Sequence, residues 1–539
     1  MLIVHRARGV SRSSNLFSRE FLRRCVLVYD AGLSLFPTVI FMATLTSTRI
    51  SLGIDLGTTD LKAALLGKDG SVHGTASSPV KSYYPKAGWS EQNPEEWWSA
   101  CLAALGDLRG RFPDAWSQVD CIGLSGQMHG VVALDVNDEP VRPAIIWNDS
   151  RATVQAAELA ERFASAVDLL GSVPMAGFTA PKVLWLKENE PGTFARIDCV
   201  MSPKDFLRLR LTGLRVTDTS DAAGTLWLDV PRRAWYEPIV NATGLTLRQL
   251  PEIVDGTSPS GYVTKQTAEQ FGLRTSVVVA GGAGDNPASA VGIGACSAGD
   301  AFVTLGTSAA IVALTDDPTA KISGGIHRFA HTLRNEWYAM GAILSGASCL
   351  RWATRILSIP SEQSLLDLIS GAIPANEIPP PDAPLFLPYL AGERTPHNDP
   401  LVRGGFMNLG VDTSPALLGY AVLEGVAFAL RDAAAAVESS GVAVGSCALV
   451  GGGARSDYWA QLLSDVLGRE LHTLVGSELG ACIGAAKLGF AACGWDPARL
   501  KTTLPVKRKF IPQPARTEAL QQRYRKFRSL FPAAQSLTS

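Results

Sequence analysis

Residues 50–66 read Ile-Ser-Leu-Gly-Ile-Asp-Leu-Gly-Thr-Thr-Asp-Leu-Lys-Ala-Ala-Leu-Leu. Two apolar runs flank a short turn of glycine and threonine, a pattern that predicts a tight β-hairpin. The tip of such a hairpin exposes backbone N–H groups and two hydroxyls, which form a concave site able to bind phosphate. Lys62 is close enough to add a positive charge, and Asp55, at the end of the first strand, is able to hold a metal ion. An ordinary hairpin with a turn aspartate is the alternative interpretation.

The same pattern returns later in the chain. Leu56-Gly57-Thr58-Thr59 and Leu305-Gly306-Thr307-Ser308 each join two apolar segments. The interval between them is far too long for a solenoid repeat. It indicates two similar half-domains, each of which opens with its own hairpin, and two hairpins across a cleft would clamp a polyphosphate from both sides.

A third glycine cluster follows the second hairpin, where residues 448–457 read as a strand, a glycine-rich turn and a helix that begins near Ser456. Glycines let the backbone approach a phosphate or a flat ring closely. The position predicts an adenosine site, and tight packing of a helix on a sheet is the alternative.

Asp285 follows a predicted buried strand, residues 275–280, and the small residues Gly281-Gly282-Ala283-Gly284. Two interpretations are open. Asp285 is the N-cap of the next helix, since Pro287 suits a first turn, or it is a general base that takes a proton from a substrate hydroxyl. The small residues before it leave space for a substrate.

Two further strand ends carry polar and aromatic groups of the kind that bind sugars. Residues 121–134 predict a strand, a turn with Gln127, Met128 and His129, and a second strand, while residues 144–151 place Trp147 and Asn148 after a short strand. Sugars are bound by aromatic faces and several directed polar groups. A surface turn, with His129 bonded to a backbone carbonyl, is the alternative.

The composition excludes several classes of protein. With 539 residues the chain is long enough for two or more domains, and 46% hydrophobic against 18% charged residues excludes a mainly disordered chain. Lys and Arg number 49 against 50 Asp and Glu, which gives no electrostatic reason to expect nucleic acid or an anionic membrane as partner. The nine cysteines form no Cys-x-x-Cys pair, so we expect buried, reduced thiols in a cytoplasmic protein rather than disulfides or zinc sites.

The first 49 residues differ from the rest. Residues 1–24 are rich in arginine, and the apolar run from Cys25 to Met42 is interrupted by Asp30 and Pro37. A signal anchor or transit peptide shows some of these features, and a dispensable extension before a true start at Met42 is the other interpretation. From Ile50 onward no apolar stretch is long enough to predict a membrane span.

Two segments with aromatic residues read as structural helices. Asn93 and Pro94 predict a helix start, and four residues then follow at the spacing of a core-facing stripe: Trp97, Cys101, Ala104 and Leu108. The basic C-terminal segment likewise predicts a docked amphipathic helix rather than a nucleic-acid site, because one face carries Leu520, Tyr524, Phe527 and Phe531.

Taken together, these segments resemble the FGGY family of carbohydrate kinases from Ile50 to about Phe531. The matching motifs are the phosphate hairpin at Asp55–Thr59, the family signature at Gly177–Asn189, the catalytic motif at Gly284–Asn286 and the adenosine motif at Gly451–Ser456. Two segments, Gln127–Gly130 and Gly392–Asn398, are similar to those of family members that phosphorylate D-xylulose.

The resemblance implies an actin-like, ribonuclease H-like duplicated two-domain α/β fold with an interdomain cleft. We expect an N-terminal extension at 1–49, a sugar-binding and catalytic domain at 50–298, a nucleotide-binding domain at 299–531 and a tail at 532–539. The implied reaction is ATP-dependent phosphorylation of D-xylulose at its 5-hydroxyl with Mg²⁺. The implied partners are the sugar and ATP, with neither nucleic acid nor membrane, in a cytoplasmic enzyme that forms a homodimer.

The resemblance also implies roles for individual residues. Asp285 would be the general base, with Asp55 beside the metal and the transferred phosphate. The sugar would be lined by Met128, His129, Trp147 and Asn286. The nucleotide would be bound by Thr58, Thr59, Lys62, Thr307, Gly346, Gly453, Ala454 and Asp457.

Two positions depart from the family pattern. Asp60 stands where many relatives have a small or hydroxyl residue, and its carboxylate would repel the γ-phosphate unless it points away or pairs with Lys62. Ala283 replaces a glycine, and its methyl group should be tolerated. A kinase for another ketopentose or sugar alcohol is the first alternative function, and a non-catalytic actin-like sugar sensor is the second.

Overall fold

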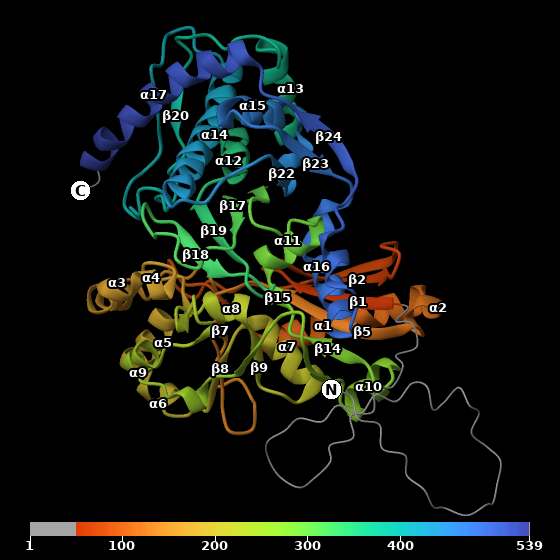
Figure 1. Cartoon of the computed structure of the whole chain (residues 1–539). Coiled ribbons are helices and arrows are strands. Elements are labelled where there is room, and N and C mark those ends of the chain that lie inside the picture. The colour runs from red at the N-terminus through yellow and green to blue at the C-terminus, as the bar shows by residue number, and fades with distance from the viewer. Residues whose placement is uncertain (1–49, 538–539) are drawn as a thin grey trace, which may run out of the picture. The chain divides into compact units, whose positions relative to one another are not determined.

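Two seven-stranded mixed sheets organise residues 50–537, the part of the chain that this computed structural model describes (Figure 1). The predictions for residues 1–49 lie outside the described residues. The first sheet follows the order β13 (Pro259–Tyr262), β14 (Val278–Ala280), β5 (Val119–Gly126), β1 (Ile50–Leu56), β2 (Asp60–Gly67), β3 (Val72–Pro79), with β15 (Ala283–Gly284) also beside β5. The second follows the order β18 (His327–Ala330), β19 (Trp337–Ile343), β17 (Ala309–Thr315), β16 (Ala301–Leu305), β22 (Cys447–Val450), β23 (Leu471–Leu474), β24 (Val506–Phe510).

The two sheets share one topology. In each, three antiparallel strands are joined by two parallel strands: β5 and β14 extend from β1, and β22 and β23 extend from β16. Both predicted hairpins are present, as β1–β2 and β16–β17. The predicted duplicated, actin-like α/β fold is therefore confirmed. The strand predicted at 275–280 is shorter, because Thr275 and Ser276 are exposed in a turn.

Alternation along β1 separates the two faces of the first sheet. Ile50, Leu52 and Ile54 pack in one apolar cluster with helix α1 (Pro94–Arg111) and with α7 (Pro203–Thr212). The Asn93 side chain accepts a hydrogen bond from Glu95 N at 3.1 Å and caps α1. The predicted stripe is confirmed, since all four of its residues are buried: Trp97, Cys101, Ala104 and Leu108.

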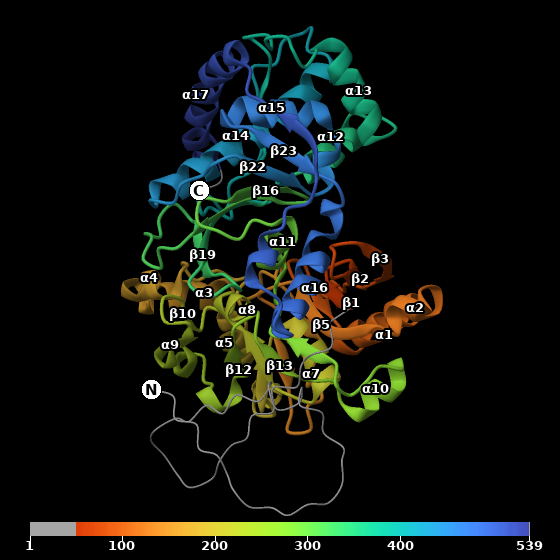
Figure 2. The ribbon, with the colours of Figure 1, turned by 45° about the vertical axis from the view of Figure 1, so that its right-hand side comes forward.

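The opposite face of the first sheet is covered by a helix from far along the chain, α16 (Gly480–Ala492), which lies beside β1, β5 and α11 (Asp285–Ile293) in both Figure 1 and Figure 2. Ser51 Oγ donates to Ala486 O at 2.6 Å. Glycines permit this contact: a Cβ on Gly123 would lie 1.7 Å from Ala485 O, and one on Gly484 would lie 1.8 Å from Ala288 O. The helix that begins with Asp285 thus rests on a helix from the C-terminal part of the chain.

The second sheet is covered by α14 (Pro415–Ser439), with α15 (Asp457–Leu467) and α17 (Pro514–Ser536) in the same apolar cluster. Leu520, Tyr524 and Phe527 of α17 are buried, so the docked amphipathic helix is confirmed. Further helices are α3 (Thr153–Arg162), α5 (Thr179–Asn189), α10 (Lys265–Phe271), α12 (Ser348–Ile356) and α13 (Glu362–Ala372). Shorter helices are α2 (Pro113–Trp116), α4 (Val167–Leu170), α6 (Pro191–Phe194), α8 (Thr219–Ala223) and α9 (Glu237–Ala242).

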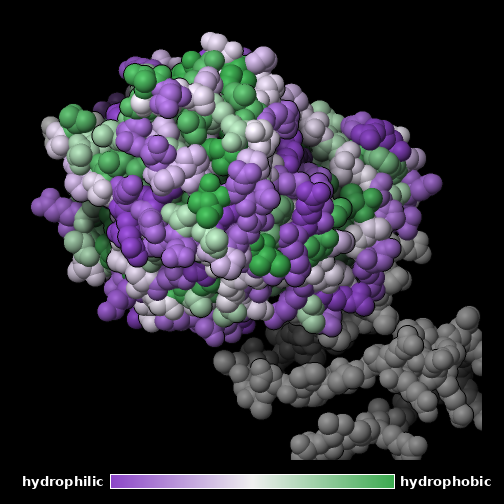
Figure 3. Space-filling view, turned by 90° about the horizontal axis from the view of Figure 1, so that it is seen from above, coloured by the Kyte–Doolittle hydropathy of each residue, from purple (hydrophilic) through white to green (hydrophobic). Residues whose placement is uncertain are grey.

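The described cysteines are free, and all but Cys493 are buried, as predicted. Across residues 50–537, every helix is too short or too polar to cross a membrane. On the face seen in Figure 3, hydrophobic and hydrophilic residues are interspersed.

Candidate active site

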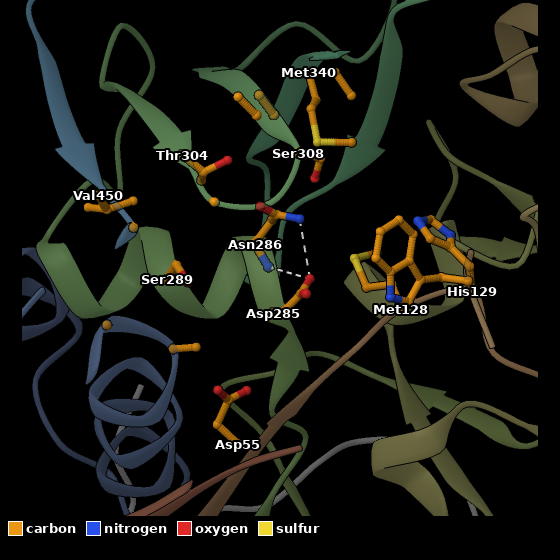
Figure 4. Close-up of a pocket in the computed structure, with 18 of the residues that line it drawn as sticks. Asp55, Met128, His129, Asp285, Asn286, Ser289, Thr304, Ser308, Met340 and Val450 are labelled. Atoms are coloured by element: carbon orange, nitrogen blue, oxygen red, sulfur yellow. Dashed lines mark hydrogen bonds between the residues drawn. The ribbon is translucent and has the colours of Figure 1, made fainter. Parts of the chain in front are cut away.

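Side chains from both halves of the chain converge on one cavity of about 400 Å³. Figure 4 shows Asp285 at the start of α11, with Asp55 on one side of it, Thr304 and Ser308 of the second hairpin on the other, and Met128 and His129 facing it across the cavity. Every residue predicted for catalysis or for the sugar lines this cavity: Asp55, Met128, His129, Trp147, Asp285 and Asn286.

Asp285 is the first residue of α11, and Gly284 occupies the N-cap position, so the N-cap interpretation of Asp285 is wrong. Its Oδ1 accepts hydrogen bonds from Asn286 N at 2.8 Å and from Asn286 Nδ2 at 3.2 Å. Burial raises the pKa of Asp285 to about 7, and the nearby charge of Asp55 raises it as well. A carboxylate with a pKa near neutrality is suited to accept a proton at working pH.

Buried polar side chains fix the backbone of the strand and loop before Asp285 through hydrogen bonds. The Arg208 guanidinium donates to Ala280 O and to Gly281 O, each at 2.5 Å. Thr332 Oγ1 donates to Gly282 O at 2.7 Å, and Gly284 N donates to Ser220 Oγ at 3.1 Å. Because each carbonyl or N–H has a fixed partner, the backbone that carries Asp285 has little freedom to move.

A cluster of three carboxylates around Lys204 lies behind this loop. Lys204 Nζ lies 2.6 Å from Asp205, 2.9 Å from Asp218 and 3.1 Å from Asp221, and all four side chains are fully buried. Asp218 in turn accepts from Ser220 Oγ at 2.5 Å. The cluster thereby connects a buried cation to the serine that holds Gly284.

Asp55 is positioned by the neighbouring parallel strand. Ser125 Oγ of β5 donates to Asp55 Oδ1 at 2.9 Å. Burial raises the pKa of Asp55, whereas Ser125 and the charge of Lys62 lower it. No group of three or more His, Cys, Asp or Glu side chains that could enclose a metal occurs within residues 50–537. Mg²⁺ in phosphoryl-transfer sites is bound by one or two carboxylates together with substrate phosphates, and the Asp55 carboxylate fits that role.

The tip of the first hairpin lies beside the cavity rather than in its lining. Thr58 Oγ1 accepts from Trp147 Nε1 at 3.0 Å and lies 3.4 Å from Gln127 Oε1, so it faces the predicted sugar loops. Asp60 forms an ion pair with Lys62 at 3.5 Å and accepts from Thr59 Oγ1 at 2.9 Å. The pairing with Lys62 is the arrangement that makes Asp60 compatible with a phosphate.

The second hairpin lines the cavity through Gly306 and Ser308, whereas Thr307 is not among the lining residues. Gly346 N donates to Thr307 O at 2.9 Å, so Gly346 supports the hairpin from outside the cavity.

The glycine-rich turn after β22 contributes Gly451 to the lining, and the predicted nucleotide residues that follow it lie beyond the cavity. Gly453 packs against Leu305, because a Cβ there would lie 2.4 Å from that side chain. Ala454 is half-buried in the same short 3₁₀ turn (Gly452–Arg455), and Asp457 begins α15 with its carboxylate paired to Arg508. Ser456 accepts from Trp459 N at 3.2 Å and caps this helix, whose start near Ser456 was predicted.

The two sugar loops are tied together by Lys182 of α5. Its Nζ donates to His129 O at 3.1 Å and to Ile146 O at 2.8 Å, which explains a lysine in the signature segment. His129 Nδ1 lies 2.7 Å from Gly224 O, and burial lowers the pKa of His129 to about 3. A carbonyl only accepts, so Nδ1 carries the proton and Nε2 is left as an acceptor.

Several residues that the sequence analysis gave no role also line the cavity, among them Phe178, Ser308, Met340 and Arg394. A signal was available for three of them, because Phe178, Ser308 and Arg394 lie within motifs that the sequence analysis had already identified. Met340 lies in β19, whose uniformly apolar sequence carries no such signal.

Comparisons with known proteins agree with this geometry. Residues 50–292 match the N-terminal domain of the FGGY family of carbohydrate kinases, and residues 301–493 match its C-terminal domain. The chain is 40% identical over 485 residues to the protein named xylulose kinase from Escherichia coli, covering 89% of this chain and 98% of that protein.

Two solved structures share the fold over nearly their whole length. A protein described as a xyloylose kinase from Brucella ovis is 41% identical, with a TM-score of 0.86 over 91% of this chain and 100% of its own. The xylulose kinase from Rhodospirillum rubrum is 27% identical, with a TM-score of 0.82 over 91% of this chain and 100% of its own.

Proposed function

The chain belongs to the FGGY family of carbohydrate kinases, and we propose that it transfers the γ-phosphate of ATP to the 5-hydroxyl of D-xylulose. The observation that carries the proposal is the convergence of the predicted catalytic and sugar residues on one cavity lined from both halves of the chain. The names of the relatives in Escherichia coli and Rhodospirillum rubrum support D-xylulose as the substrate.

In the proposed reaction Asp285 is the general base. The O5–H bond of the sugar breaks, the proton goes to the Asp285 carboxylate, and O5 forms a bond to the γ-phosphorus. The bond from that phosphorus to the β,γ-bridging oxygen breaks, and ADP leaves with the electron pair. Because Asp285 has few degrees of freedom, the arrangement supplies the in-line positioning on which phosphoryl transfer depends.

Asp55 is the residue we assign to Mg²⁺. When bound, Mg²⁺ would neutralise negative charge on the phosphates. Asp55 itself is half-buried, lines the same cavity as Asp285 and is fixed by Ser125, so it contributes a positioned carboxylate. We assign the contacts with the γ-phosphate to Thr58, Thr59 and Lys62.

The second half of the molecule is the nucleotide side of the proposal. Ser308 and Gly306 present the second hairpin to the cavity, and Gly451 approaches it from β22. We assign the β-phosphate to Thr307, supported by Gly346, and the nucleoside to the turn and helix start at Gly453, Ala454 and Asp457.

The boundaries 50–298 and 299–531 describe these two functional halves, although α16 of the second half packs on the first sheet. Free, buried cysteines support a cytoplasmic enzyme.

Met128, His129, Trp147 and Asn286 are the proposed sugar residues. The unprotonated Nε2 of His129 is an acceptor for a sugar hydroxyl, and the apolar faces of Met128 and Trp147 form the wall. Such a mixture of an apolar wall and a few directed polar groups is typical of sugar pockets.

The test is ADP release by the full-length protein with Mg-ATP and a panel of D-xylulose, D-ribulose, L-xylulose, xylitol, glycerol and gluconate, against a no-sugar control. D-xylulose should stimulate release most, because water is the only competing nucleophile without a sugar. Stronger stimulation by another sugar would keep the kinase mechanism and overturn the substrate. Release that no sugar stimulates would overturn the proposed function.

A further inference from the structure

Arg394 reaches the cavity from a loop of the second half whose backbone is firmly anchored to β19 and its end. Thr395 Oγ1 accepts from Ala342 N at 3.0 Å and donates to Gly325 O at 3.0 Å. Glu393 Oε1 accepts from Leu344 N at 3.0 Å and from Arg394 N at 2.7 Å. The neighbours on both sides of Arg394 are therefore fixed, and the side chain of Arg394 lines the cavity.

The guanidinium of Arg394 makes no hydrogen bond and no ion pair within 4 Å to any residue in the described range 50–537. Two buried arginines show the contrasting arrangement, in which protein acceptors surround the guanidinium. Arg523 binds the Glu424 carboxylate at 2.6 Å and the carbonyls of Pro384 and Ala383, and Arg208 binds Asp205 and the carbonyls before Asp285. A guanidinium with five donors and no protein acceptor, in a cavity wall, is available to a ligand.

The position of this guanidinium along the cavity is given by its neighbours. The backbone of Arg394 lies against Gly325, since a Cβ on Gly325 would be 2.9 Å from Arg394 O. Two residues further on, His327 packs on the ring of Phe178, which also packs on His129, with ring centroids 5.6 and 4.8 Å apart. Arg394 therefore lies at the His129 end, in agreement with its charge lowering the pKa of His129. The charge that acts on Asp285 is that of Asp55, at the phosphate end. A sugar whose reacting hydroxyl meets Asp285 therefore extends its other end toward Arg394.

The chemistry of a ketopentose identifies that other end. Ring closure of D-xylulose uses the 5-hydroxyl itself, so a molecule whose 5-hydroxyl is free to be phosphorylated is in its open-chain form. The open chain has a C2 carbonyl next to a C1 hydroxymethyl group, at the end opposite to O5. A carbonyl oxygen only accepts hydrogen bonds, and a guanidinium only donates them.

We propose that Arg394 donates to the C2 carbonyl oxygen of the open-chain ketose and thereby selects ketoses over the corresponding sugar alcohols. The proposal rests on the proposed function, because it takes D-xylulose to be phosphorylated at O5. A sugar alcohol such as xylitol has a hydroxyl at C2 instead. The hydroxyl oxygen is a weaker acceptor, and it rotates, so its lone pairs are not held in one plane as those of a carbonyl oxygen are. Arg394 is thus a specificity-determining residue contributed by the nucleotide-side half of the molecule.

The experiment compares D-xylulose and xylitol in steady-state assays of the full-length protein with saturating Mg-ATP. Turnover gives kcat and KM for D-xylulose, and xylitol is measured as an inhibitor competitive with it, which gives its Ki. The variants are Arg394→Gln and Arg394→Lys. The matched control is Arg351→Gln, an arginine of the same half that is 73% exposed and paired with Glu362.

In Arg394→Gln, kcat/KM for D-xylulose should fall by about 10- to 100-fold, the effect of losing a charge-assisted hydrogen bond. The Ki of xylitol should change by less than about threefold, so the preference for the ketose collapses. Arg394→Lys should recover part of the preference, because it restores a cationic donor. Arg351→Gln should match the wild type.

Equal losses for the ketose and the alcohol, or no loss at all, would overturn the inference and leave the proposed function standing. A wild-type protein that does not turn over D-xylulose would overturn the proposed function and this inference with it. The two failures are therefore distinguishable in one data set.

Discussion

Asp55 and Asp285 line the same cavity, and the negative charge of Asp55 is, after burial, the second cause that raises the pKa of Asp285 to about 7. Asp55 is the penultimate residue of β1 and Asp285 is the first residue of α11, so two elements of the first half bring the pair together. Two like charges in a buried site favour the protonated form of one of them. Asp285 is consequently poised to exchange a proton near neutral pH.

This relationship predicts the pH dependence of catalysis. Only the ionised Asp285 carboxylate accepts the proton of the sugar hydroxyl, and its pKa is raised, so the active form is lost as the pH falls through about 7. We expect kcat/KM for D-xylulose, at saturating Mg-ATP, to be level above pH 8 and to fall about tenfold per unit well below pH 7. A profile that stays level down to pH 5 would show that no group of this pKa acts in the reaction.

His129 is predicted to contact the sugar through Nε2 and to support its own loop through Nδ1. Asn fits the positive φ of this position (69°), and its Nδ2 can replace the bond from Nδ1 to Gly224 O. His129→Asn should therefore unfold at the wild-type temperature and yet lower kcat/KM for D-xylulose by about 10- to 100-fold, through KM. Wild-type kinetics in this variant would remove His129 from the sugar site.

Asp60 is predicted to weaken the phosphate site slightly by engaging Lys62. Asp60→Ser removes a negative charge near the phosphates and frees Lys62 from its 3.5 Å ion pair. KM for Mg-ATP should fall by about two- to fivefold at low ionic strength, and the difference should vanish at about 1 M salt, where surface charges are screened. Lys62→Met is the opposing variant and should raise the same KM. A higher KM in Asp60→Ser would mean that the carboxylate assists binding.

The contact between α16 and α11 is predicted to support both stability and activity. A methyl group on Gly484 would lie 1.8 Å from Ala288 O, so Gly484→Ala must push the two helices apart. We expect a loss of about 1–3 kcal/mol in the free energy of unfolding, with lower kcat because α11 begins with Asp285. The control is Gly106→Ala in α1, where the added methyl meets no atom within 4 Å, and it should be neutral or stabilising by up to about 1 kcal/mol. Equal melting temperatures for both variants would contradict the proposed close contact.

Local sequence patterns were sufficient to predict the two hairpins and the positions of the residues proposed to act in the reaction. The two apolar runs around the turn in residues 50–66, and their return at residues 301–314, predict two similar half-domains, and the structure has two sheets of the same topology. The same reasoning placed Asp55, His129 and Asp285 at strand or helix ends, where their side chains reach one cavity. Strand ends and turns have short-range signals, so a single sequence carries them.

Long-range packing left no such signal. Gly480–Ala492 is mostly apolar and rich in small residues, with no clear polar face, so nothing local shows that it packs on β1 and β5 of the other half. Arg394 stands in a segment with a family motif, but nothing local shows that its side chain reaches the same cavity as His129. Lys182 reads as one basic residue of a helix, although its amine joins two loops through backbone carbonyls. Partners of that kind have no sequence signature, since any residue provides a carbonyl.

The central claim is that Asp285 is the general base of a sugar kinase, and the most direct measurement compares the wild type with Asp285→Asn. ADP release with D-xylulose and the Kd of ATP are measured on the same preparations, with Asp107→Asn, an exposed partner of Arg111, as the control. The account predicts a loss of about 10²- to 10⁴-fold in sugar-dependent turnover with an ATP Kd within about threefold of the wild type. An Asp285→Asn protein that keeps more than about a tenth of wild-type turnover would contradict it.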